Sequence, residues 1–139
     1  MIAIKPSDYE SIKHFFADIP GSLWHLESLK SRNIGTVFID ILPNTKSVCI
    51  ESPFSFYYFA GAYNASFMMD CISHMVRTLI PVGEQRPMFI FSPDDAWKMG
   101  LENYLKPYAN QHFGAYLTRR LHHLNHKRYE DVRKSLLIS

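Results

Sequence analysis

Hydrophobic and polar positions follow their clearest pattern between residues 35 and 63. Residues 35–42 are rich in β-branched and aromatic side chains, which suit a pleated, half-buried strand. A turn with proline and asparagine follows at 43–45, and residues 46–52 then alternate between apolar and polar positions. A strongly aromatic run at 54–60 comes after a second proline. This pattern predicts an antiparallel meander of three strands.

The alternation also assigns the faces of the second strand. It places Val48 and Ile50 on one face, and Ser47, Cys49 and Glu51 on the other. We expect Glu51 to face solvent.

Apolar residues recur at helical spacing on both sides of this meander. The predicted helices are residues 8–19, 22–32, 64 or 66 to 79, 93–105 (ended by Lys106-Pro107), and a short one at 127–137. The run Met88–Phe91 is short and continuously apolar, which is typical of a strand covered on both faces. Residues 112–121 are predicted as a further strand.

The resulting order is α-α-β-β-β-α-β-α-β with a short C-terminal helix. It predicts an α+β fold, an α/β sandwich with a mixed sheet, in one domain spanning residues 1–139. The strand at 88–91 should lie parallel to that at 54–60, because the connection between them is long enough for a crossover.

Composition adds few constraints on function. With 47% hydrophobic residues the chain is globular, and 15 basic against 13 acidic residues give a net charge of +2, too small to imply a partner. Neither a signal peptide nor an apolar run of about 18 residues occurs. We therefore expect a cytoplasmic protein without membrane contact, in which Cys49 and Cys71 are free thiols.

The order of elements resembles the GNAT fold of N-acetyltransferases. Residues 35–40, 44–47 and 56–61 resemble more closely the N-terminal half of two-part GNAT acetyltransferases of Gram-positive bacteria. In those proteins a degenerate GNAT-like domain precedes the catalytic domain that holds acetyl-CoA. The family's cofactor loop, Gln/Arg-x-x-Gly-x-Gly/Ala, is absent here, because residues 59–67 contain one glycine and the bulky Tyr63.

This resemblance implies a non-catalytic N-terminal domain of an acetyltransferase, inactive on its own. Its partner would be the C-terminal catalytic domain, and acetyl-CoA would bind there and not to this chain. The domain would help to shape the cleft for the acceptor substrate, with Tyr57, Tyr63, Arg119 and Arg120 as the candidate contacts.

The basic segment 119–128 suggests a different class of function. The chain could instead be a self-contained binding module that contacts an anionic partner through this segment; nucleic acid is not the expected partner. If the segment is helical, His122 and His126 are spaced to share a metal ion, although no acid lies between them. A homodimer is left open.

The remaining reactive side chains have ordinary structural explanations. Asp40, Asp94 and Asp95 stand at predicted strand or helix ends and are expected to act as caps. A buried structural role is expected for Cys71. The aromatic cluster at 54–67 is expected to form core.

Overall fold

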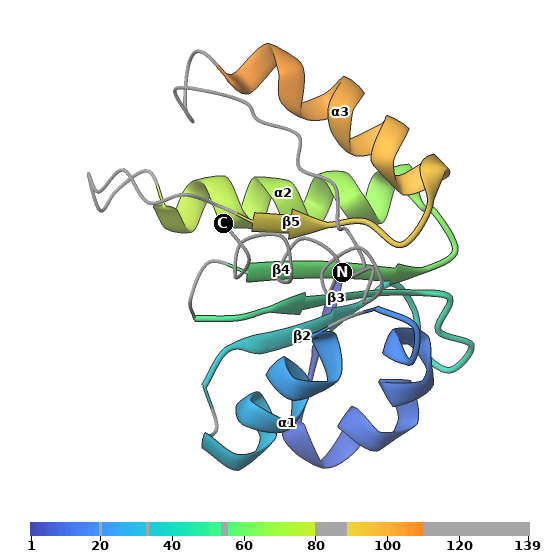
Figure 1. Cartoon of the computed structure of the whole chain (residues 1–139), viewed down its shortest axis with the longest axis vertical. Coiled ribbons are helices and arrows are strands. Elements are labelled where there is room, and N and C mark those ends of the chain that lie inside the picture. Colours follow the sequence, from blue (N-terminus) through green and yellow to red (C-terminus); the bar gives the residue numbers. More distant parts are fainter. Residues whose placement is uncertain (20, 33, 54–55, 80–88, 110–139) are drawn as a thin grey trace, which may run out of the picture.

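A computed structural model describes residues 1–19, 21–32, 34–53, 56–79 and 89–109. Within these residues four helices, one of them a 3-10 helix, surround an open mixed sheet of five strands (Figure 1). In chain order the elements are β1 (Ile2–Ile4), η1 (Pro6–Phe16), α1 (Ser22–Arg32), β2 (Thr36–Ile39), β3 (Ser47–Glu51), β4 (Phe56–Gly61), α2 (Ala65–Leu79), β5 (Phe89–Phe91) and α3 (Asp95–Ala109). In this part of the chain no helix is long and apolar enough to cross a membrane.

The strands lie in sequence order, β1-β2-β3-β4-β5. The first four are antiparallel, and the predicted meander is therefore confirmed. β5 pairs parallel to β4, with Phe56 opposite Phe89 and Tyr58 opposite Phe91. The crossover through α2 places β5 beside β4, as the length of the connection predicts.

Helices cover both faces of the sheet (Figure 1). Val48, Ile50 and Tyr58 pack on the side of η1 and α1. Cys49 and Phe59 pack on the side of α2 and α3. Successive side chains of a strand point to opposite faces, so β3 and β4 each contribute to two cores. The predicted division of β3 into two faces is confirmed, and both faces are buried.

Several predicted boundaries were wrong. β1 was not predicted, because three residues are too few to show a period. The first helix is a 3-10 helix that ends at Phe16, and the i→i+3 spacing of its buried Tyr9 and Ile12 suits that geometry. α3 continues past Pro107 to Ala109. Proline is disfavoured beyond the first turn of a helix, because it lacks the backbone donor and crowds the carbonyl four residues earlier; the continuation of α3 is an exception to that rule.

β5 also differs from expectation. Phe89, Ile90 and Phe91 are each only partly buried. Ile90 packs against the core on the side of α2 and α3, and Phe91 against the core on the side of η1 and α1, so the predicted cover on both faces is present but incomplete. The predicted strand at 112–121 and helix at 127–137 lie outside the described residues.

Candidate functional site

The loop that follows β4 is tied to β3 through its backbone. Gly61 has a φ of +81°, and a Cβ at this position would overlap the carbonyl oxygen of Lys46. That same carbonyl accepts a hydrogen bond of 2.8 Å from the Ala62 N–H. The Ser47 hydroxyl donates to the Ala62 carbonyl oxygen at 2.6 Å. Gly61 is therefore required by a close backbone approach, and the Ala62 N–H is not available to a ligand.

Trp97 covers the end of β4 from the side of α3. The register between β4 and β5 ends at Tyr58, so Phe59 and Gly61 extend beyond the last paired residue. Trp97 is fully buried there and its ring stacks on Phe59, with 4.9 Å between the ring centroids. Its Nε1–H donates to the Gly61 carbonyl oxygen at 2.9 Å. The indole thus fills the space beside β4 beyond the last residue that pairs with β5, where β4 remains paired with β3.

The position of Trp97 is fixed by the start of α3. Asp94 caps this helix, because its Oδ1 accepts a hydrogen bond of 3.0 Å from the Trp97 N–H. Asp95 lies in the first turn. The predicted capping role is confirmed for Asp94.

Tyr63 forms the outer layer of the same cluster. Its ring meets Trp97 edge-on at a centroid distance of 5.4 Å and lies directly over Gly100, where a Cβ would overlap the ring. Tyr63 remains 39% exposed. Behind it α2 is capped by Asn64, whose Oδ1 accepts from the Phe67 N–H at 3.1 Å. Of the aromatic residues in this cluster, Tyr63 is the exposed one, whereas Trp97 and Phe59 are fully buried.

A second group of polar side chains lies at the other end of β4, beneath α2. Glu51 and Tyr57 face each other across β3 and β4. His74 of α2 brings its Nε2 to 3.1 Å from Glu51 Oε2. Glu51 Oε2 is buried and accepts no hydrogen bond, although it lies within ion-pair distance of His74 Nε2. The side chain of Glu51 is only 20% exposed, so the expectation that it faces solvent was wrong.

Two buried side chains of this region, Tyr57 and Cys49, are held in their protonated forms. Burial, followed by the charge of Glu51 and then by Cys49, raises the pKa of Tyr57 to about 12. Burial also raises the pKa of the Cys49 thiol well above its usual value, followed by the hydrogen bond with Cys71. Both groups are therefore neutral at physiological pH. Among the described residues, no set of three His, Cys, Asp or Glu side chains could hold a metal ion.

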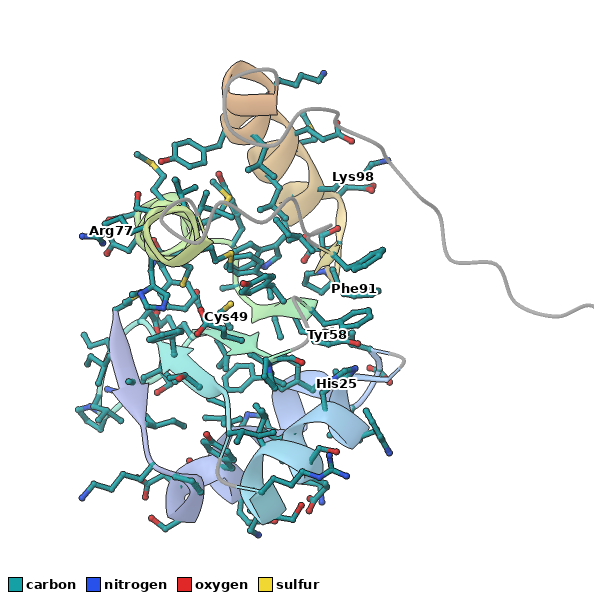
Figure 2. All side chains as sticks on the ribbon, turned by 90° about the vertical axis from the view of Figure 1, so that its left-hand side faces the viewer. His25, Cys49, Tyr58, Arg77, Phe91 and Lys98 are labelled. Atoms are coloured by element: carbon teal, nitrogen blue, oxygen red, sulfur yellow. The ribbon has the colours of Figure 1, made fainter. Side chains whose placement is uncertain are left out.

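A third group is aromatic and lies on the opposite face of the sheet. Figure 2 shows His25, Tyr58 and Phe91 along one edge of the molecule. The His25 ring lies 5.2 Å from that of Tyr58, which stacks on Phe91 at 4.5 Å. Burial lowers the pKa of His25, so its imidazole is neutral at physiological pH. The neighbouring Trp24 is 65% exposed.

Two of the predicted site residues, Tyr57 and Tyr63, lie in the described part of the chain, and they are not brought together. Tyr57 is only 4% exposed and contributes to the core beneath α2, whereas Tyr63 lies beyond the other end of β4. Both remain predictions as substrate contacts. Arg119, Arg120, His122, His126 and the rest of segment 119–128 lie outside the described residues.

Other sequence predictions are settled by the contacts. Cys71 is buried, as expected. Asp40 accepts backbone hydrogen bonds from Ile41 and Lys46 and so holds the β2–β3 turn, consistent with its expected capping role. The hydrogen bond between Trp97 and Gly61 was not predicted, because 36 positions separate the two residues in the sequence.

Comparison with known proteins assigns no family. A scan against models of protein families finds no match to this chain, and a search of curated proteins finds no similar sequence.

Proposed function

We propose that this chain is a non-catalytic, GNAT-like domain of an N-acetyltransferase. It supports the catalytic domain and contributes to the cleft for the acceptor substrate, while acetyl-CoA binds elsewhere. The observation that carries the proposal is the position of Trp97, whose indole stacks on Phe59 and donates to the Gly61 carbonyl oxygen.

The parallel strands β4 and β5 border the space in which a GNAT enzyme would hold its cofactor. In the GNAT fold that the sequence resembles, the cofactor inserts where the strands equivalent to β4 and β5 separate. The mixed sheet has this parallel pair, and its register ends at Tyr58. The space beyond contains Trp97, which is 0% exposed. A pantetheine chain would have to displace a fully buried indole.

The backbone of the loop supports the same conclusion. A pyrophosphate bound at a helix N-terminus requires free N–H groups and a close approach of the backbone. The Ala62 N–H is already bonded to Lys46, and the Phe67 N–H to Asn64. The ring of Tyr63 lies across Gly100 of α3, beside the loop.

Calorimetric titration of the chain with acetyl-CoA tests the first part of the proposal. We expect no saturable heat, whereas an active GNAT enzyme titrated in the same buffer provides the positive control. Saturable binding in the micromolar range, with about one site per chain, would contradict the proposal.

The supporting role has a separate test. Sequencing the natural transcript past the codon for Ser139 shows whether translation continues. We expect an open frame that enters a second domain with a glycine-rich cofactor loop. A stop codon directly after Ser139 would contradict the supporting role and favour the alternative of an anionic partner bound by residues 119–128.

A further inference from the structure

The helices α2 and α3 separate toward their C-terminal ends, and a cavity lies between them (Figure 1). Near the start of α3 the packing is close, because the Tyr63 ring lies directly over Gly100. Further along, Ile72 and Val76 of α2 and Tyr104 of α3 line a cavity of about 200 Å³. This volume is sufficient for one aromatic ring, since an apolar cavity of roughly 150 Å³ holds benzene.

The cavity between α2 and α3 has an apolar floor and a basic rim. Ile72 is 1% exposed and belongs to the buried core. Val76 and Tyr104 are partly buried and pack against that core. Ser73 and the exposed Arg77 complete the lining, and among the described residues that form it Arg77 carries the one charge. A ligand that suits this cavity has an apolar body and a negatively charged group.

The guanidinium of Arg77 is anchored through one nitrogen. Its Nε–H donates to the carbonyl oxygen of Ser73, one turn earlier in α2, at 3.3 Å. A guanidinium has further N–H donors on its two terminal nitrogens, and no carboxylate in the described part of the chain lies within ion-pair distance of them. Figure 2 shows Arg77 on the outer side of α2, at the side of the molecule away from Phe91 and Lys98.

We propose that this cavity binds a small aromatic carboxylate, with the ring between α2 and α3 and the carboxylate on Arg77. A guanidinium and a carboxylate match as a pair of parallel hydrogen bonds, which are stronger than bonds between neutral groups. The ring contacts Ile72, Val76 and the aromatic side chain of Tyr104. The lining shares no residue with the contacts of Trp97 at the end of β4, so this site does not depend on the function proposed above.

Size and charge together restrict the ligand to this class. Pockets for drug-sized ligands have volumes of roughly 300–1,000 Å³, so a cavity of about 200 Å³ is too small for a nucleotide or for coenzyme A. A small anion without a ring would leave the apolar walls in contact with water. A neutral ring would leave the guanidinium without a carboxylate.

Titration of the full chain with benzoate, followed by NMR of methyl groups and backbone amides, tests the proposal. We expect saturable shifts of the Ile72 and Val76 signals, with one site per chain and a Kd on the order of 1 mM. Benzyl alcohol has the ring without the charge and should bind about tenfold more weakly. Acetate has the charge without the ring and should cause no saturable shift at these residues.

Matched variants identify the group that holds the carboxylate. Arg77→Gln should weaken benzoate binding by about tenfold and leave the affinity for benzyl alcohol unchanged. Arg32→Gln is the control, because Arg32 is also exposed and lies in the last turn of its helix, and it should change neither affinity. The absence of saturable shifts at Ile72 and Val76, equal affinities for benzoate and benzyl alcohol, or unchanged benzoate binding in Arg77→Gln would each overturn the proposal.

Discussion

Replacing Trp97 separates the two contacts that hold it at the end of β4. In Trp97→Phe an aromatic ring can still stack on Phe59, but the hydrogen bond of 2.9 Å to the Gly61 carbonyl oxygen is lost. A net hydrogen bond is worth about 1 kcal/mol, and a carbonyl left without a partner costs about 1–3 kcal/mol. We therefore expect the free energy of unfolding to fall by about 2 kcal/mol.

Trp97→Ala removes the ring as well. Because this side chain is fully buried, the loss should reach about 3–5 kcal/mol, as for other large aromatic residues truncated in a core. Trp24→Phe is the matched control, since Trp24 is 65% exposed. Its effect should stay within about 0.5 kcal/mol.

Urea unfolding followed by far-ultraviolet circular dichroism measures all three variants without depending on tryptophan emission. Fluorescence of Trp24→Phe adds a direct view of Trp97, the one tryptophan left in that chain. Its emission should be blue-shifted and poorly quenched by acrylamide. If Trp97→Ala were as stable as Trp24→Phe, or if Trp97 were quenched like a free indole, the packing described for this residue would be refuted.

Three other changes have defined outcomes. Gly61→Ala should lower the free energy of unfolding by more than about 2 kcal/mol in urea unfolding, because φ is +81° and the new Cβ meets Lys46. Gly100→Ala should be nearly neutral in the same assay, since about 1 kcal/mol of helix propensity is offset by displacement of the Tyr63 ring. The free energy of unfolding should also fall between pH 10 and about pH 12, because the Tyr57 phenol loses its proton first in the unfolded chain. Urea unfolding measured across this pH range should show a loss on the order of 2 kcal/mol.

Each of these outcomes has its control. Tyr63→Ala removes the ring that opposes Gly100→Ala, which should then stabilise the protein by about 1 kcal/mol; an unchanged effect would show that the two residues are independent. The alkaline loss should shrink in Tyr57→Phe, and an identical pH profile would contradict the assignment. Wild-type stability in Gly61→Ala would mean that the loop tolerates a side chain.

Sequence predicted the elements better than their ends. The meander and the parallel β5 followed from short-range alternation and from the length of one connection, which are local properties. The continuation of α3 past Pro107 did not, because proline disfavours a helix beyond its first turn and the local sequence favours an end there. The burial of Glu51 was missed for another reason: its partner His74 lies on a helix that alternation within one strand cannot reveal.

The candidate site was less predictable than the fold. The absence of a glycine-rich loop after β4 was visible in the sequence, but not the indole that lies beside the end of β4. Trp97 falls within the predicted helix 93–105, but a helical pattern says nothing about its hydrogen bond to Gly61. Likewise, the sequence spacing of Cys49 and Cys71 does not reveal that both belong to the buried cluster on the side of α2.

A crystal structure of the full chain grown with a large excess of acetyl-CoA tests the closure of this site most directly. Our account predicts that the indole of Trp97 stays on Phe59, with its Nε1–H bonded to the Gly61 carbonyl oxygen and no cofactor between β4 and β5. Acetyl-CoA bound between these strands, with Trp97 displaced, would contradict the account and restore an acetyl-CoA site to this domain.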